Sequence, residues 1–187
     1  MYAFLEKNPD FKLLKFFSEN PLRELYVKEI SRELKLSSGS VSVVCRELEK
    51  DGLLKSRRQG NILFYKADRN NFLIKEFAKI FLIKKLNSIN FIESFLKEDQ
   101  NILSLAIYGS FAEAGNNKQS DLDVLVITSS GNKFIKAAEE LSKKLSIEIR
   151  QVIFSLHEWG QLSKKRDVFY LNVINNHLLL YGSNLVI

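Results

Sequence analysis

A short acidic pattern in the second half of the chain restricts the fold more than any other feature. Residues 109–127, GSFAEAGNNKQSDLDVLVI, set Asp121 and Asp123 at the start of a run that is otherwise typical of a buried strand. Isolated ionised groups are costly in a low-dielectric interior, and they persist there mainly when they are paired or bind a metal. The two carboxylates therefore indicate a functional site at the beginning of a β-strand.

The composition is typical of a globular protein, because 45% of the 187 residues are hydrophobic and 27% are charged. A single cysteine, Cys45, excludes an intrachain disulfide and a cysteine-rich zinc site, which fits a reducing cytoplasm. The first residues, MYAFLEKNPDF, carry charges and no long apolar core, so we expect neither a signal peptide nor an anchor. No apolar run approaches a membrane span, and we expect a cytoplasmic protein with no membrane partner.

The positive charge is unevenly distributed along the chain. The formal net charge is +6. Residues 1–99 hold 19 Lys and Arg against 14 Asp and Glu, a net of +5, whereas residues 100–187 hold 9 against 8, a net of +1. The charge permits a polyanionic partner, and the basic excess lies in the first half of the chain.

Helical periodicity dominates the first fifty residues and then gives way to an extended pattern. Three amphipathic helices are predicted, followed by two arms of a β-hairpin that a Gln-Gly-Asn turn connects. The predicted helices cover 10–18, 26–34 and 41–48, and the hairpin arms cover 53–58 and 62–67. The first hairpin arm is basic.

This order of elements, VKEISRELKLSSGSVSVVCRELEKDGLLKSRRQGNILFYKA, resembles the winged-helix transcription-regulator families over roughly residues 8–70. The resemblance implies a winged helix-turn-helix domain over residues 1–70 that binds double-stranded DNA. If the third helix enters the major groove, its outward side chains and the basic arm of the wing would contact DNA. These candidate residues are Ser38, Ser40, Ser42, Arg46, Arg57 and Arg58.

Two other interpretations of these polar faces remain open. They could be ordinary solvated surfaces, which the acidic residues Glu47, Glu49 and Asp51 along the same helix favour. They could also belong to a winged helix that contacts protein rather than DNA.

The segment that follows contains neither proline nor glycine and is dense in apolar residues on more than one face. We interpret residues 71–100 as a helical connector of one or two helices, buried between domains or against a second copy of the chain. A homodimer formed through this connector is one expectation.

From residue 101 onward, strands and helices alternate, which predicts a small α/β or α+β domain over residues 101–187. The overall fold class is therefore α+β. The predicted strands cover 102–108, 121–127, 147–154 and 177–181, and the predicted helical segments cover 133–145 and 156–176.

The acidic pair suits a particular chemistry. Residues 121 and 123 point to the same face of a strand about 7 Å apart, and their oxygens are the ligands that hard divalent cations such as Mg²⁺ prefer. Gly109 and Ser110 directly follow an apolar strand, where backbone amides and a hydroxyl can approach phosphate oxygens. This combination favours transfer of a phosphoryl or nucleotidyl group from a nucleoside triphosphate.

The pattern of strand, Gly-Ser, spacer and Ser-Asp-x-Asp resembles the minimal nucleotidyltransferases of the DNA polymerase beta superfamily over residues 101–182. The resemblance implies that Gly109 and Ser110 hold the triphosphate and that Asp121 and Asp123 are Mg²⁺ ligands and catalytic residues. The whole chain resembles prokaryotic proteins, common in archaea, that join a winged helix to such a domain.

The sequence departs from this family pattern at the third carboxylate, where our alignment places Arg150. Glu148, two residues earlier, is the candidate that could substitute as a catalytic carboxylate, with a displacement of about 7 Å. Glu113 and Ala114 stand where many relatives carry arginine and glycine. Several functions therefore stay open: a competent nucleotidyltransferase, a degenerate domain in a transcriptional regulator or antitoxin-like protein, or a mere turn at Asp121.

Overall fold

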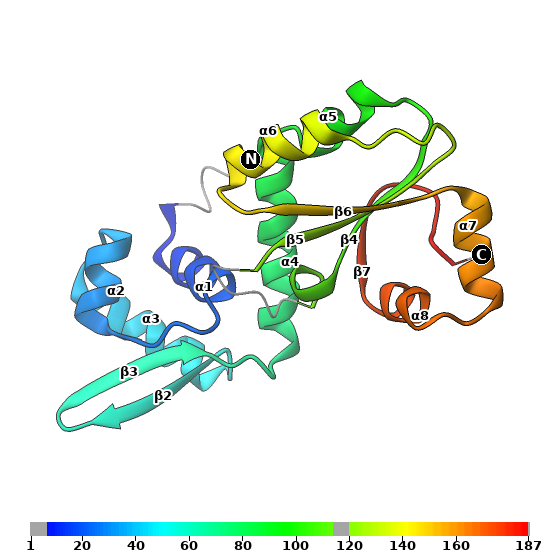
Figure 1. Cartoon of the computed structure of the whole chain (residues 1–187). Coiled ribbons are helices and arrows are strands. Elements are labelled where there is room, and N and C mark those ends of the chain that lie inside the picture. Colours follow the sequence, from blue (N-terminus) through cyan, green and yellow to red (C-terminus); the bar gives the residue numbers. More distant parts are fainter. Residues whose placement is uncertain (1–6, 114–119, 187) are drawn as a thin grey trace. The chain divides into compact units, whose positions relative to one another are not determined.

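The computed structural model describes residues 7–113 and 120–186, and it shows a mixed α+β protein (Figure 1). Two compact units, Met1–Phe81 and Leu82–Ile187, divide within the helix α4 (Phe72–Ser88). The three predicted segments, 1–70, 71–100 and 101–187, stay a prediction. In the described part of the chain, no helix combines the length and the apolar character that crossing a membrane requires.

The N-terminal unit contains the predicted helices and hairpin, whose ends differ from the prediction by at most three residues. A polar side chain begins two of the helices: Asn8 accepts from the Asp10 amide at 2.7 Å, and Ser37 accepts from the Ser40 amide at 3.1 Å. The elements are α1 (Pro9–Glu19), β1 (Leu25–Tyr26), α2 (Val27–Leu34), α3 (Ser38–Lys50), β2 (Leu54–Gln59) and β3 (Ile62–Ala67).

The sheet of this unit has the order β1-β3-β2, with both pairs antiparallel. The hairpin register runs from Leu54 opposite Ala67 to Gln59 opposite Ile62. The short strand β1 was not predicted, because two residues carry no detectable periodicity. Apolar side chains from all three helices and the hairpin form one buried core, which includes Leu13, Ile30, Val44, Cys45 and Tyr65.

The C-terminal unit is built on a mixed sheet with the strand order β6-β5-β4-β7. The central strands β4 and β5 are antiparallel, β7 is antiparallel to β4, and β6 is parallel to β5. The elements are α5 (Phe91–Glu98), β4 (Ile102–Tyr108), the short 3₁₀ turn η2 (Gly109–Phe111), β5 (Leu122–Thr128), α6 (Ile135–Leu145), β6 (Ile149–Phe154), α7 (Leu156–Lys164), α8 (Val168–Asn175) and β7 (His177–Gly182).

Helices cover both faces of this sheet, because alternate residues of β4 and β5 are apolar on each side (Figure 1). Ile107, Val124 and Val126 pack in a core with α5 and α6. Leu125 and Ile127 pack on the opposite face with α7 and α8, around the buried Trp159. Asp123 has the same alternation as Leu125, so it lies on the α7 and α8 face at the start of β5.

Two predicted elements are corrected by the structure. The helical segment 156–176 is two helices, because Arg166 adopts a left-handed φ of 50° and the Asp167 side chain then caps α8 by accepting from the Phe169 amide at 2.8 Å. Strand β6 begins at Ile149 rather than at residue 147. Helix α6 ends with Ser146 in the left-handed conformation, and residues 147 and 148 connect it to the strand. Glu148 therefore precedes the strand.

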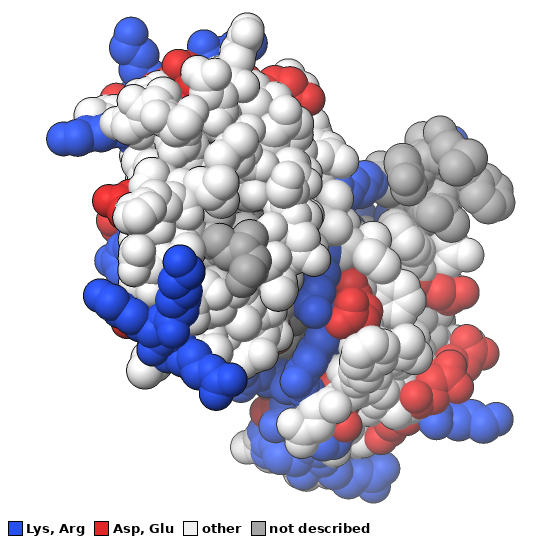
Figure 2. Space-filling view, turned by 90° about the vertical axis from the view of Figure 1, so that its right-hand side faces the viewer, with Lys and Arg blue, Asp and Glu red and all other residues white. Residues whose placement is uncertain are grey.

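The surface on the side of α7 and α8 is largely uncharged. Figure 2 faces the side where these helices lie in Figure 1, and a broad part of it carries no Lys, Arg, Asp or Glu side chain. Exposed apolar residues on these helices include Leu156, Val168 and Leu171. The exposed cations of this side, Lys164, Lys165 and Arg166, lie at the end of α7 and in the loop that leads to α8.

Candidate functional site

Gly109 and Asp123 are in direct contact, which joins the two parts of the sequence pattern into one site. Tyr108, the last residue of β4, is paired with Asp123 of β5, so the chain turns at Gly109 immediately beside the carboxylate. Gly109 has φ +69°, and a Cβ added there would lie 2.6 Å from Asp123 Oδ2. Only glycine combines this left-handed backbone with so close an approach.

The η2 turn is anchored from its C-terminal side. Phe111 and Ala112 are buried, and the Glu113 amide donates to the Gly109 carbonyl at 3.1 Å. Ser110 lies between these anchors and Gly109 and is partly exposed. Its hydroxyl is therefore held on a fixed turn next to the acidic pair. Ala114 lies outside the described residues.

Asp123 is partly buried beside the apolar core that α7 and α8 cover. Burial raises the pKa of its carboxyl above the ordinary range, the Arg150 guanidinium opposes this rise, and the Asp121 carboxylate adds to it. Burial and the Asp121 charge make the ionised carboxylate less favourable, whereas the Arg150 charge makes it more favourable. An additional positive charge at this position would therefore be bound favourably.

Arg150 lies next to the acidic pair. It is directly opposite Asp123 in the parallel register of β5 and β6. Its Nη2 is 2.8 Å from Asp121 Oδ2, and its Nε is 3.5 Å from Glu148 Oε1. The guanidinium thus links Asp121 and Glu148, while 60% of the arginine side chain remains exposed.

The two aspartates have the donor chemistry of a Mg²⁺ site, because carboxylate oxygens are the ligands that this cation prefers. Gly109 supports the same conclusion, since its missing Cβ leaves the approach to Asp123 open. Within residues 7–113 and 120–186, no group of three or more His, Cys, Asp or Glu side chains is arranged so that it could hold a metal ion. Binding of a divalent cation by Asp121 and Asp123, and the role of Glu148, stay predictions.

Glu148 is nevertheless held near the pair by the backbone. Its carbonyl accepts from the Leu122 amide at 2.8 Å, which places it beside the residue between the two aspartates. Its side chain is 65% exposed.

Tyr108 is a residue of the site that the sequence reasoning missed. It is paired with Asp123 on one side and His177 on the other, and its ring packs edge-on against Phe169 with the centroids 5.4 Å apart. Burial raises the pKa of its hydroxyl, and the Asp123 charge adds to this rise. The signal that could have identified Tyr108 is its position as the last strand residue before Gly109.

A comparison with protein families gives a match over the segment that contains this site. The family model described as "Polymerase beta, Nucleotidyltransferase" matches residues 90–184, just over half of the chain. The chain belongs to this nucleotidyltransferase family. The matched segment contains Gly109, Ser110, Asp121, Asp123 and Arg150, whereas α1, α2, α3 and the hairpin lie outside it.

Solved structures similar to this nucleotidyltransferase-family chain share little sequence with it. A toxin-antitoxin crystal structure with AMP-PNP is 19% identical, covering 50% of this chain and 73% of that chain at a TM-score of 0.39. NolR from Sinorhizobium fredii is 17% identical, covering 40% and 71% at a TM-score of 0.31. At these scores neither similarity bears on function. The search of curated proteins gave no match.

In the N-terminal unit, the predicted contact residues of α3 are mostly exposed. Ser38, Ser40 and Arg46 are exposed, and Ser42 is half-buried. Ser38, Ser42 and Arg46 follow one another at intervals of four residues, which places them in one stripe of the helix. The Arg46 Nε donates to the Ser42 carbonyl at 3.1 Å, so the side chain folds back along its own helix.

The two arginines of the hairpin have different surroundings. Arg57 forms an ion pair with Glu24 at 2.7 Å, and its guanidinium lies 5.4 Å from the centroid of the Phe64 ring. Arg58 is exposed. Part of the Arg57 charge is therefore neutralised within the unit, and the contribution of each arginine to binding stays a prediction.

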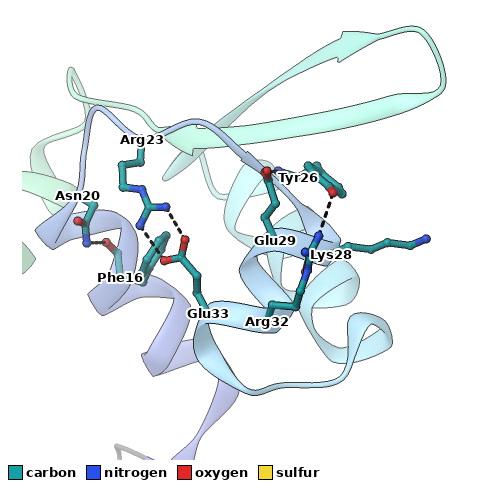
Figure 3. A network of polar contacts seen from close by, with 8 residues as sticks. All are labelled: Phe16, Asn20, Arg23, Tyr26, Lys28, Glu29, Arg32 and Glu33. Atoms are coloured by element: carbon teal, nitrogen blue, oxygen red, sulfur yellow. Dashed lines mark hydrogen bonds and ion pairs between the residues drawn. The ribbon is translucent and has the colours of Figure 1, made fainter.

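A polar network fixes α2 relative to the segment before it (Figure 3). Arg23 Nη1 donates to Glu33 Oε2 at 2.7 Å, and the Arg23 guanidinium lies over the Phe16 ring. The Arg32 Nη2 donates to the Tyr26 hydroxyl at 3.1 Å, and its Nε donates to the Lys28 carbonyl, whereas the Lys28 side chain extends away from the network (Figure 3). The helix that precedes α3 is thus held by both of its ends.

Proposed function

We propose that this chain is a DNA-binding protein whose nucleotidyltransferase domain binds Mg²⁺ and a nucleoside triphosphate. One observation carries the nucleotide part of the proposal: Gly109 lies so close to Asp123 that a Cβ at Gly109 would be 2.6 Å from Asp123 Oδ2. A backbone turn held against a carboxylate brings a phosphate-binding element and a cation ligand to the same point, which is the arrangement that a metal-bound polyphosphate needs.

Each residue has a separate task in this proposal. Gly109 leaves room for phosphate oxygens beside the turn, and the Ser110 hydroxyl donates a hydrogen bond to them. Asp121 and Asp123 hold the cation. When bound, Mg²⁺ would neutralise the phosphate oxygens and polarise the phosphorus for attack.

Calorimetric titration of the four ribonucleoside triphosphates in Mg²⁺ tests this part directly. We expect the wild type to bind at least one of them, and the Asp121→Asn, Asp123→Asn double variant to bind at least about tenfold more weakly, because two charge-assisted ligands are lost. A wild type that binds none of the four, or a double variant that binds equally well, would overturn the proposal.

The DNA part of the proposal rests on the N-terminal unit. The order of three helices and a β-hairpin, with a short strand paired to the hairpin, supports the proposal of a winged helix-turn-helix. The exposed residues Ser38, Ser40 and Arg46, together with Ser42, would face the major groove from α3. Arg58 and Arg57 would contact the phosphate backbone from the wing.

A second candidate function is regulation without nucleotidyl transfer, as in a transcriptional regulator or an antitoxin-like protein. The ion pair between Arg150 and Asp121 favours it, because a guanidinium stands where a third metal ligand would be needed. Incubation with Mg²⁺ and triphosphates labelled at the α-phosphate separates the two functions. Label transferred to an acceptor by the wild type and not by Asp121→Asn supports transfer, whereas no transfer by a wild type that binds nucleotide supports regulation.

We also propose that α4 contributes to a homodimer. Phe72, Leu73 and Ile80 are exposed apolar residues on this helix. Light scattering after size exclusion should then give twice the mass of the chain, and Ile80→Glu should give the single mass. A wild type that is monomeric throughout the accessible concentration range would exclude this proposal.

A further inference from the structure

The Arg150 guanidinium competes with any cation for the same carboxylate oxygen. Its Nη2 lies 2.8 Å from Asp121 Oδ2, so that oxygen cannot accept a cation on the same side while the ion pair is formed. Arg150 is also opposite Asp123 in the sheet, which keeps its charge near both aspartates. Two positive charges a few ångströms apart repel each other, so an arginine in this place weakens the binding of a free divalent cation.

The same arginine can leave Asp121 at little cost. Its side chain is 60% exposed, and exposed ion pairs contribute little to stability. Its contact with Glu148, at 3.5 Å, is long and is also exposed. The arginine is therefore held near the site by its position in β6 and not by buried contacts.

Phosphate is the ligand class that best matches such a guanidinium. Arginine forms planar, bidentate hydrogen bonds with phosphate oxygens and remains charged at any physiological pH. The Gly109 and Ser110 turn, where we place the phosphates, meets β5 at Asp123, directly opposite Arg150. A triphosphate there lies within reach of a long side chain that starts on the neighbouring strand.

We propose that Arg150 is a phosphate-binding residue that exchanges Asp121 for the triphosphate, so that nucleotide binding releases Asp121 to the divalent cation. This inference rests on the proposed nucleotide-binding function. It predicts that the cation binds weakly to the free protein and that nucleotide strengthens its binding more in the wild type than in a variant without the guanidinium.

The test compares Arg150→Gln, Arg150→Lys and wild type in two binding measurements. Mn²⁺ affinity without nucleotide is measured by electron paramagnetic resonance, and ATP, GTP, CTP and UTP affinities are measured in EDTA. We expect Arg150→Gln to bind Mn²⁺ about threefold to tenfold more tightly and to bind the metal-free triphosphate more weakly by a similar factor. Arg150→Lys keeps the charge and should bind Mn²⁺ as the wild type does, with triphosphate affinity between the two.

Arg166→Gln is the matched control, because it removes another exposed arginine of the same unit from the loop between α7 and α8. It should change neither constant. A merely structural role of Arg150 would weaken both ligands, so tighter Mn²⁺ binding is specific to competition.

Unchanged or weaker Mn²⁺ binding in Arg150→Gln overturns the inference. If the wild type binds a triphosphate and Arg150→Gln binds it equally well, the inference is overturned too. Failure of the proposed function is distinguishable from these results. In that case the wild type binds none of the four triphosphates even in Mg²⁺, and both proposals fall together.

Discussion

Replacing Gly109 by alanine should disable the site while leaving the fold intact. The new methyl group would lie 2.6 Å from Asp123 Oδ2 but 3.5 Å from its Cγ and 3.7 Å from its Cβ, so rotation of the carboxylate can relieve the clash. The remaining cost is the left-handed backbone at φ +69°, about 1 kcal/mol for a residue with a Cβ. We therefore expect a modest loss of stability and a misplaced cation ligand.

Gly131→Ala is a matched control for the backbone cost. Gly131 has the same φ of +69°, and nothing lies within 4 Å of the position that its Cβ would take. Urea unfolding should give both variants the same free energy of unfolding to within about 1 kcal/mol. Calorimetric titration should show that only Gly109→Ala binds the Mg²⁺ complex of the triphosphate at least about tenfold more weakly, because one carboxylate ligand is displaced.

The reasoning would be refuted if Gly109→Ala and Gly131→Ala bound the nucleotide equally well. The contact between Gly109 and Asp123 would then be a packing detail with no part in binding. A carboxyl-directed carbon NMR experiment on Asp123 adds an independent readout, since its resonance should move in Gly109→Ala and remain in place in Gly131→Ala.

Four further predictions concern other residues. The Asp99 carboxylate is buried and accepts hydrogen bonds from Thr128 and Ser130; although burial alone would raise its pKa, these bonds lower it. A carboxyl whose pKa is lowered in the folded state stabilises the fold at pH values above its ordinary pKa. Asp99→Asn should therefore lower the free energy of unfolding in urea by about 1–2 kcal/mol at neutral pH, and variant and wild type should become equally stable in acid. A stability difference that is the same at both pH values would contradict this. Burial raises the pKa of Cys45 to about 12, so a thiol reagent should label it only after unfolding, and rapid labelling of the native protein would be contrary to the structure. Glu148→Gln should reduce Mn²⁺ affinity about tenfold if Glu148 is a cation ligand, whereas an unchanged affinity would limit its role to the contact with Arg150. Replacing Arg57 and Arg58 together by alanine should weaken duplex DNA binding in fluorescence anisotropy and reduce the salt slope by about 2, and an unchanged slope would remove the wing from the interface.

The fold could be predicted from local patterns where each element carries its own period. The α3 stripe of Val41, Val44 and Leu48 and the alternation along β5 both specify an element and its buried face without reference to the rest of the chain. The two-residue strand β1 and the break at Arg166 could not be predicted in this way. Both depend on partners elsewhere, the first on β3 and the second on the cap that Asp167 provides for α8.

The site was predictable in its composition but not in its geometry. Gly109 and Asp123 are fourteen positions apart, and only the antiparallel register of β4 and β5 shows that they touch. The family resemblance placed Arg150 at the position of the third carboxylate, but its ion pair with Asp121 depends on side-chain positions that a sequence pattern does not contain. Tyr108 was missed for the same reason, since its role depends on pairing with Asp123.

Crystals of the wild type grown with Mn²⁺ and a non-hydrolysable triphosphate provide the most direct measurement of the proposed site. We predict an anomalous Mn²⁺ peak about 2.2 Å from carboxylate oxygens of both Asp121 and Asp123, with phosphate oxygens against the Gly109 and Ser110 turn. The account would be contradicted by crystals in which the nucleotide is bound elsewhere, Arg150 is still paired with Asp121, and no cation peak lies beside the two aspartates.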